Sequence, residues 1–395
     1  MSNQDTFPHT ELDQRPGIHL LKEVKGHDFT LQTLQKAFDS NRLHHAYLFH
    51  GPSGVGKKRS ALVLARLLLC SQTVSLHHPT NGIETIACGH CQSCRRIYQF
   101  ILEKNGIYHP DLHIISRDRD SSGKLAKEIK IAPIRELQSA LNLGSFEGGK
   151  TVIIIEDVDR LGLSAANALL KTLEEPLANV HFLLTTNSLN SVLPTIKSRA
   201  QSLRFAPLKL EILLDLLNKF QGWSQREDDT ETYTPLEPQQ LESLAQLSGG
   251  SLGKALRLWG QGGMDKVIRL IQQSDLSGGA QDYLKALEFV KQFEKASEED
   301  LELWLHVLRC WYRDALVLIH GAYEIPRFFP SLSEITMQRG QTLGIERLQW
   351  RLQALDEGEK HLLKRTGSNK KLILETLCLY LAGFDAMTQQ PLQIS

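Results

Sequence analysis

The residues best suited to chemistry in this sequence form a glycine-rich loop between an apolar run and a leucine-rich segment. The run 46–49 reads AYLF, and the sequence HGPSGVGKK follows it. Glycines let backbone N–H groups converge on an anion, and the positive end of the following helix adds to the attraction. Lys57 stands where such a loop places the ammonium group that reaches the outer phosphates. The order of strand, loop and helix therefore predicts a phosphate-binding loop that contains Gly51, Gly54, Gly56 and Lys57.

Position 58 departs from the pattern of a hydrolysing loop. Such a loop has a serine or threonine hydroxyl after the lysine to bind Mg²⁺, but this sequence has Lys58. The ammonium group replaces a metal ligand and repels a divalent cation. We therefore expect that this loop can bind ATP but that hydrolysis is disfavoured.

Four of the six cysteines form a second chemical feature between positions 70 and 94. Cys88, Cys91 and Cys94 have the spacing C-x2-C-x2-C, which suits one tetrahedral Zn²⁺. In a reducing compartment zinc is favoured over disulfide bonds, and four protein ligands leave no position for a reacting water, so we expect a structural metal. The fourth ligand is Cys70 or, alternatively, a nearby histidine: His77, His78 or His90.

Two acids follow the most apolar of the predicted strands. The segment 151–155 reads TVIII, which is typical of a strand in the centre of a parallel sheet, and Glu156 and Asp157 come directly after it. Acids at that edge of a sheet can bind Mg²⁺ beside a phosphate loop and polarise an attacking water. Acids also commonly begin a turn there, and Lys58 disfavours a metal, so we expect no catalytic role for this pair.

The elements that position these residues alternate between strand and helix as far as position 205. The predicted strands, at 46–49, 112–116, 151–155, 181–186 and 202–205, indicate a parallel α/β sheet. Beyond Pro207 the pattern is helical, with a serine- and glycine-rich hinge at 274–279. Two apolar stripes farther along are expected in a core: the first comprises Leu301, Trp304, Leu305, Leu308, Trp311 and Ala315, and the second Ile345, Leu348, Leu352 and Leu355.

Length and composition exclude several classes of protein. A chain of 395 residues is expected to form two to three domains, and its 45 lysines and arginines balance 45 acids, so there is no global positive charge for nucleic acid. The first 25 residues lack the apolar core of a signal peptide, and Arg66 interrupts the longest leucine-rich run. We expect a cytoplasmic protein without a membrane span.

The motifs occur in an order that resembles one family. GPSGVGKK, the cysteine cluster, HPD, IIIEDVDRL, SAANALLKTLEEP, TTN and SR are together similar to the clamp-loader subunits of bacterial DNA polymerase III, which belong to the AAA+ proteins. The resemblance is strong to about Phe205 and looser beyond it. It implies an α/β AAA+ P-loop domain with a parallel sheet and a zinc module at 1–206, a small helical lid at 207–273, and an all-helical collar domain at 283–395 that joins subunits into a ring.

Three positions separate the two subunit classes that the motifs resemble, the ATP-hydrolysing tau/gamma motor and the delta-prime class. The motor has threonine where this chain has Lys58, and Asp then Glu where this chain has Glu156 then Asp157. It also carries a phosphate-sensing arginine at the place of Gly253. All three departures favour the delta-prime class, with the motor subunit as the alternative. An isolated P-loop kinase or a zinc-dependent DNA binder would fit single motifs but not their order.

Arg199 is the one catalytic residue that the resemblance implies. The pair Ser198-Arg199 matches the family position that places a guanidinium against the ATP of a neighbouring subunit, where a fixed charged fork suits the γ-phosphate. Ala200 replaces the cysteine usual after that arginine. The implied partners are tau/gamma and delta subunits in a hetero-oligomeric ring, with the sliding clamp and primed DNA reached through the complex.

Overall fold

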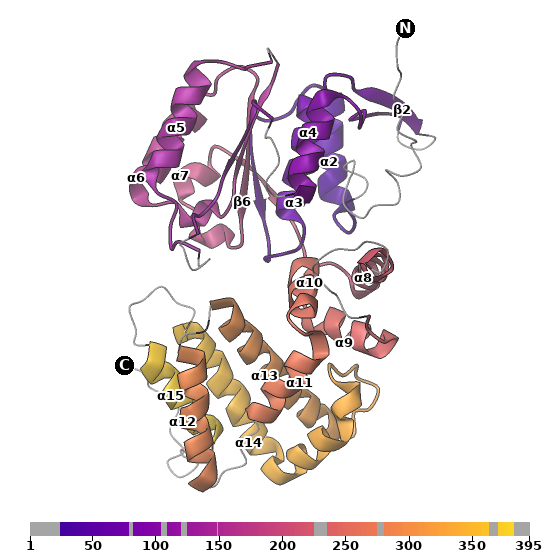
Figure 1. Ribbon diagram of the computed structural model, residues 1–395, viewed down its shortest axis with the longest axis vertical. Helices are drawn as coiled ribbons and strands as arrows, with labels where there is room; N and C mark the ends of the chain where they lie inside the picture. The colour runs from indigo at the N-terminus through magenta and orange to yellow at the C-terminus, as the bar shows by residue number, and fades with distance from the viewer. Residues whose placement is uncertain are drawn as a thin grey trace. The chain divides into compact units, whose positions relative to one another are not determined.

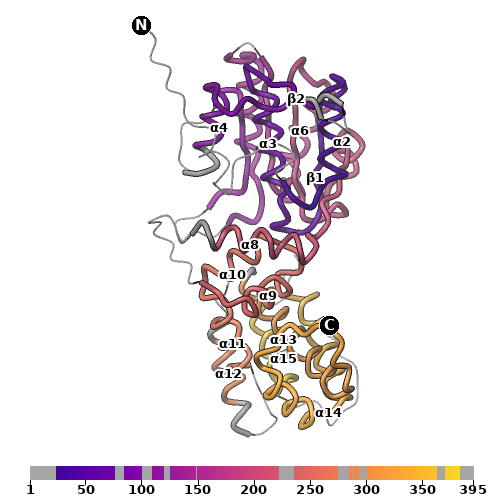
Figure 2. Tube along the Cα trace, turned by 90° about the vertical axis from the view of Figure 1, so that its right-hand side faces the viewer, coloured from indigo at the N-terminus to yellow at the C-terminus, as the bar shows by residue number. Residues whose placement is uncertain are grey.

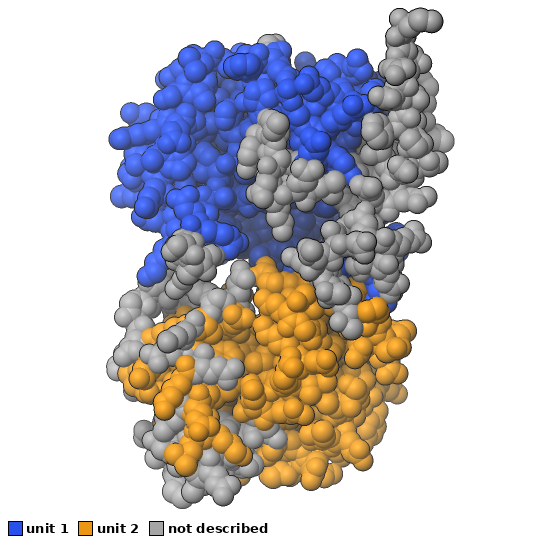
Figure 3. Space-filling view, viewed as in Figure 1, with its two compact units in different colours: residues 1–229, 249–254 blue, residues 230–248, 255–395 orange. Residues whose placement is uncertain are grey.

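The computed structural model describes residues 24–78, 82–103, 109–119, 125–147, 149–224, 235–274, 280–294, 296, 298–362 and 370–382. The chain divides into two compact units, coloured differently in Figure 3. The first unit comprises Met1–Asp229 with Gly249–Lys254, and the second comprises Thr230–Ser248 with Ala255–Ser395. The expected division into core, lid and collar remains a prediction.

A five-stranded parallel sheet forms the centre of the first unit, in the order β4-β5-β6-β1-β7. Its strands are β1 (Ala46–His50), β4 (Leu112–Ile115), β5 (Thr151–Ile155), β6 (Val180–Thr186) and β7 (Gln201–Arg204). Each lies within one residue of its predicted bounds. The predicted parallel α/β arrangement, followed by a helical region, is confirmed.

Helices cover both faces of this sheet because its central strands are apolar on both sides (Figure 1). Tyr47 and Phe49 of β1 pack into one hydrophobic cluster, whereas Ala46 and Leu48 pack into the other, as the two-residue repeat of a strand requires. One face carries α2 (Asp28–Asp39), α3 (Lys57–Leu69) and α4 (Gln92–Glu103), and the other α5 (Ile131–Asn142), α6 (Leu163–Glu174) and α7 (Pro194–Lys197).

A small antiparallel pair, β2 (Val74–His78) and β3 (Gly82–Ile86), stands apart from the main sheet. The pair connects α3 to α4 and therefore lies in the chain between Cys70 and the other three cysteines of the cluster. The first unit also contains α8 (Leu210–Ser224). The start of α10 (Leu252–Gly260) belongs to the first unit as well, which brings residues 249–254 back to the sheet domain.

All regular secondary structure in the described part of the second unit is helical. Its helices are α9 (Pro238–Leu247), α11 (Gly263–Gln273), α12 (Ala280–Glu294), α13 (Glu298–Ile319), α14 (Ser333–Leu362) and α15 (Lys370–Leu381), with the rest of α10. Figures 1 and 2 show α13, α14 and α15 packed together. A kink at Gly344, with φ 74° and ψ 167°, interrupts α14.

The first predicted apolar stripe is confirmed as core, because all six of its residues on α13 are buried. The second is confirmed in part: Leu348 and Leu355 are buried, but Ile345 is 39% exposed. Most of the predicted hinge at 274–279 lies outside the described residues. None of the helices in the described part of the chain is long and apolar enough to cross a membrane.

Candidate functional site

The glycine-rich loop joins the end of β1 to the start of α3, as predicted. Gly51, Gly54 and Gly56 have φ values of 149°, 75° and 111°, a region in which side chains are strained. A Cβ at Gly51 would lie 1.9 Å from the backbone oxygen of Phe205. Glycine is therefore required at position 51 for close backbone approach as well as for the turn. Positive φ values of this kind are what a loop needs for its backbone N–H groups to turn toward an anion.

Lys57 is turned into this loop and is held by the loop's own oxygens. Its ammonium donates to the backbone oxygens of Gly51 and Pro52, both at 2.6 Å, and to Oδ1 of Asn187 at 2.9 Å. Burial lowers the pKa of Lys57 to about 8, and the negative charges of Asp157 and Asp159 act in the opposite direction. The ammonium thus has three oxygen partners without any phosphate.

Residues 251–253 lie directly against the phosphate loop, although the sequence separates the two segments by about two hundred residues. The Gly253 N–H donates to the Gly54 oxygen at 2.9 Å, and the Ser251 hydroxyl donates to the Ser53 oxygen at 2.8 Å. A Cβ at Gly253 would lie 2.8 Å from the Gly54 Cα. Position 253 therefore has no room for a side chain in this arrangement, and the expected loss of a phosphate-sensing arginine there coincides with a backbone contact.

Lys58 and the strand-end acid Glu156 form an ion pair of 2.7 Å, with their side chains 50% and 21% exposed. Because α3 and β5 are adjacent in the fold, the first residue after the motif lysine reaches the acid at the carboxyl edge of the sheet. The ammonium group therefore neutralises the charge of this carboxylate within the chain.

The second acid, Asp157, is paired with a different cation. Arg117 donates from Nε and Nη2 to Asp157 Oδ2 at 3.1 and 2.9 Å, and the Asn187 amide donates to Oδ1 at 3.4 Å. Asp157 itself has φ 51°, a left-handed conformation uncommon for a residue with a side chain. Both acids after β5 are thus neutralised within this chain, which is consistent with the expectation that they begin a turn.

The four cysteines of the cluster are brought together by α3, the loop after β3 and the start of α4. Their sulfur atoms all lie within 4.8 Å of one another. Cys70 Sγ lies 3.6 Å from Cys88 Sγ and 3.9 Å from Cys91 Sγ. Backbone N–H groups of Cys88 and Cys91 donate to Cys70 Sγ and Cys88 Sγ, both at 3.3 Å.

This arrangement fits a zinc ion. Tetrahedral zinc with Zn–S bonds of about 2.3 Å separates its sulfur ligands by about 3.8 Å, close to the two distances above. The geometry favours Cys70 over histidine as the fourth ligand. His90 is exposed and its Nδ1 lies 2.9 Å from the Cys88 oxygen, while the side chains of His77 and His78 lie outside the described residues.

Arg199 lies between α7 and β7. The start of β7 pairs with the start of β1, whereas the phosphate loop follows the end of β1. Arg199 Nη2 forms an ion pair of 2.6 Å with Glu174 at the end of α6, and its Nη1 donates to the Thr195 oxygen at 2.9 Å. The side chain remains 33% exposed. These contacts hold the guanidinium in a defined place without burying it.

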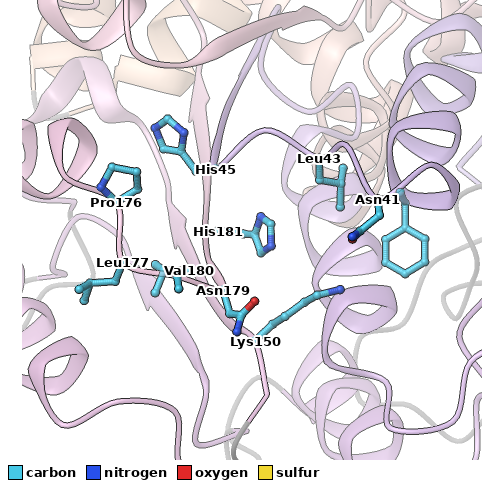
Figure 4. Close-up of a pocket in the computed structure, with 11 residues that line it drawn as sticks. Asn41, Leu43, His45, Lys150, Pro176, Leu177, Asn179, Val180 and His181 are labelled. Atoms are coloured by element: carbon cyan, nitrogen blue, oxygen red, sulfur yellow. The ribbon is translucent and has the colours of Figure 1, made fainter.

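A cavity of about 410 Å³ lies at the opposite edge of the same sheet (Figure 4). Its lining includes His45, which precedes β1, Lys150, which precedes β5, and His181 at the start of β6. Ligands of open α/β sheets bind at the carboxyl ends of the strands, whereas this cavity lies at their amino ends. It is therefore separate from the phosphate loop and the acids.

Three residues of the site were not singled out from the sequence: Arg117, Asn187 and Ser251. Arg117 and Asn187 each follow a predicted parallel strand, so the rule that carboxyl ends meet at one sheet edge could have placed both beside Lys57. No comparable signal exists for Ser251, because only the tertiary fold brings it to the loop.

Comparisons of the sequence with known proteins identify relatives of this chain. The family model described as "DNA polymerase III, delta subunit" matches residues 26–209, and "DNA polymerase III, delta subunit, C terminal" matches residues 268–382. The DNA polymerase III subunit delta' of Escherichia coli is 28% identical over 352 residues, which cover 88% of this chain and 92% of that protein. The subunit delta' of Bacillus subtilis is 36% identical over 187 residues, 47% of this chain and 50% of that protein.

A relative named as subunit tau matches a smaller share of the chain than the E. coli delta' subunit does. The DNA polymerase III subunit tau of Salmonella typhimurium is 32% identical over 239 residues, 60% of this chain and 32% of that protein. The chain thus spans half or less of the length of some relatives and nearly all of the E. coli delta' subunit. With both family models matched in order along the chain, this protein belongs to the delta-prime branch of the DNA polymerase III clamp-loader family.

Proposed function

We propose that this chain is a non-hydrolysing subunit of a bacterial clamp loader. In this role it braces a hetero-oligomeric ring with tau/gamma and delta subunits and supplies Arg199 to the ATP of a neighbour. The sliding clamp and primed DNA are reached through the complex, in the cytoplasm. Residues 207–273 would serve as the lid and residues 283–395 as the collar that joins the ring.

The observation that carries the proposal is that both acids after β5 and the motif lysine are already paired within this chain. Lys58 pairs with Glu156 at 2.7 Å, and Arg117 pairs with Asp157 at 2.9 Å, so neither acid is free to hold Mg²⁺ or to polarise water. Lys57 is already bound to loop oxygens. In this site, the side chains of Lys58 and Arg117 pair with the acids that a motor subunit would use to bind a metal ion.

The same contacts favour a loop that stays without nucleotide. The Gly253 N–H and the Ser251 hydroxyl occupy loop oxygens, and their segment lies against Gly54. A triphosphate would have to displace these contacts and draw Lys57 away from its three oxygens. We therefore propose that the loop serves as a rigid joint between the sheet and residues 249–254.

Zinc has a structural part in this proposal. Cys70, Cys88, Cys91 and Cys94 would hold one ion, which would tie the β2–β3 pair and α4 to the end of α3. All four positions of a tetrahedral ion would be filled by thiolates, so the metal would contribute to folding of this module.

The proposal is tested by reconstitution. ATPase activity and clamp loading are measured for tau/gamma and delta subunits with clamp and primed DNA, with and without this chain. We expect this chain alone to be inactive and the mixture to require it. Robust ATP turnover by the isolated chain would instead support the motor class, and a mixture indifferent to its addition would contradict a role in the ring.

A further inference from the structure

Arg66 is a buried cation beside the cysteine cluster. Its burial has no role in the phosphate loop described above. It lies in the last turn of α3, four residues before Cys70, and is only 6% exposed. Residues four apart on a helix lie on the same face, so Arg66 points toward the same module as Cys70. Burying a guanidinium is costly unless an opposite charge is near it.

The described residues supply no carboxylate partner for this guanidinium. None of the ion pairs found among them includes Arg66, and its Nε atom is buried without a hydrogen-bond partner. Its guanidinium lies instead against the backbone of the cysteine run, at Gly89. Without a metal, this buried guanidinium therefore has no carboxylate among the described residues to balance its charge.

The backbone around the cluster leaves space for this approach. A Cβ at Gly89 would lie 3.1 Å from Arg66 Nη2. Gly89 has φ 83° and lies between Cys88 and Cys91 in the knuckle of the cluster. Glycine thus permits both the turn between the cysteines and the close packing of the guanidinium beneath it.

Charge balance supplies the missing partner. A zinc ion with four thiolates carries a net charge of about −2, because each ligand must be deprotonated. Cys70 also stands at the carboxyl end of α3, where the helix dipole disfavours negative charge. The positive charge of Arg66 offsets both the net negative charge of the centre and the unfavourable helix dipole. The negative centre in turn offsets the free-energy cost of burying the guanidinium.

We propose that Arg66 is the counter-charge of the four-cysteine metal centre. This inference rests on the zinc site of the proposed function but concerns a residue outside the ligand set. Partners of this kind, which contact ligands rather than the metal, commonly change metal affinity by about 10- to 100-fold.

The test compares three substitutions at position 66 with one matched control. Arg66→Met removes the charge and keeps an apolar stem, Arg66→Gln keeps polarity without charge, and Arg66→Lys restores the charge. Arg95→Met removes an exposed arginine next to Cys94. Zinc affinity is measured by competition with a chromophoric chelator, and the melting temperature is measured for the zinc-loaded and the metal-free form of each full-length protein.

We expect Arg66→Met and Arg66→Gln to weaken zinc binding by about 10- to 100-fold, with Arg66→Lys closer to wild type and Arg95→Met unchanged. The increase in melting temperature on zinc binding should be smaller in Arg66→Met and Arg66→Gln. In the metal-free protein these substitutions remove a buried cation that lacks a counter-charge. In the zinc-loaded protein they remove the counter-charge of the metal centre. A purely structural arginine would instead lower both melting temperatures equally.

Equal zinc affinities in wild type, Arg66→Met and Arg66→Gln would overturn the proposal. If Arg66→Met does not fold, the comparison of Arg66→Lys with Arg66→Gln decides, and equal affinities in those two variants would contradict a role of the charge. If zinc content is absent already in the wild-type protein, the zinc site itself fails, which separates that outcome from failure of the Arg66 inference.

Discussion

Lys58 Nζ lies 2.7 Å from a carboxylate oxygen of Glu156, so the residue that replaces a metal-binding hydroxyl also neutralises the acid that would face the metal. Lys58 and Glu156, which both differ from the residues of a hydrolysing site, therefore form a single ion pair. An exposed ion pair contributes little to stability, typically below about 1 kcal/mol. Its consequence lies in the electrostatics of the site, since a cation already stands beside the acid.

The first prediction is that the isolated chain has no appreciable ATPase activity and that Lys58→Thr does not create any. The substitution restores a hydroxyl and frees Glu156, but Asp157 stays paired with Arg117 and position 253 stays without a side chain. Phosphate release is measured for wild type and Lys58→Thr, with Lys57→Ala as the background control. Turnover that appears in either protein and disappears on loss of Lys57 would contradict this prediction.

The second prediction concerns the protonation of Lys57. Burial lowers its pKa to about 8 from 10.5, so between these values the unfolded chain holds a proton that the folded chain has released. The free energy of unfolding should therefore rise with pH across this window as far as this group is concerned. NMR titration of ¹³C-methylated lysines, assigned with Lys57→Arg, should give a value near 8.

Added ATP should leave that titration unchanged, because the proposed loop does not take up phosphate. A bound phosphate would stabilise the ammonium and raise the pKa of Lys57. A shift toward higher pH on addition of ATP would therefore show that the loop binds nucleotide.

The third prediction is that Gly253→Ala destabilises the protein by about 1–3 kcal/mol, the range typical of overpacking. The new Cβ would meet the Cα of Gly54 at 2.8 Å, and a backbone atom cannot move aside as a flexible side chain can. Urea unfolding monitored by fluorescence gives the free energy. Gly149→Ala is the matched control, since nothing lies within 4 Å of a Cβ there. Equal midpoints for the two variants would show that residues 249–254 are not held against the loop.

The sequence predicted the groups that are local in the chain and missed those that tertiary structure assembles. The strands, the phosphate loop and the cysteine run each depend on short-range patterns, so their bounds agreed to within one residue for every strand of the main sheet. The pairing of Lys58 with Glu156 joins positions about a hundred residues apart and has no local signature. The same holds for Ser251 on the loop and for Arg66, which the sequence marks only as an interruption of a leucine-rich run.

The β2–β3 pair was also missed, and for a different reason. The strands read VSLHH and GIETI, so each has only two apolar residues and lacks the nearly continuous apolar run that marks the central strands of the main sheet. Its place in the fold follows from the proposed metal centre, which the cysteine spacing indicated. The cysteine spacing predicted the metal ligands but gave no sign of the β2–β3 pair, which lies in the chain between Cys70 and Cys88.

The fourth prediction is that purified protein contains about one zinc per chain, as one four-ligand site implies. Cys88→Ser should lose most of it, because serine is a poor zinc ligand, whereas His90→Ala should retain it, since the four thiols are already within 4.8 Å of one another. Elemental analysis measures the content, and calorimetry compares loaded and chelated protein. Loss of zinc in His90→Ala would make that histidine a ligand, and identical melting of loaded and chelated protein would remove the structural role.

The fifth prediction concerns Arg199. If its guanidinium serves a neighbouring ATP, Arg199→Ala should fold normally and join the complex, because its side chain is one-third exposed and its Glu174 partner is about half exposed. The assembled loader should lose part of its clamp-stimulated ATPase. An arginine finger contributes roughly 10³ to 10⁵ at the site that depends on it, but other sites in the ring would take their arginines from other subunits.

Three companion variants separate that role from loss of a surface charge. Arg204→Ala removes an exposed arginine five residues farther on and should leave the ATPase unchanged. Arg199→Lys should rescue little, because lysine keeps the charge but not the planar fork. Glu174→Gln breaks the 2.6 Å ion pair while sparing the guanidinium, so it should lower the ATPase less than Arg199→Ala if Glu174 only orients the arginine. At matched assembly, equal ATPase and clamp-loading rates for wild type and Arg199→Ala would show that the pair with Glu174 is the whole role of this arginine.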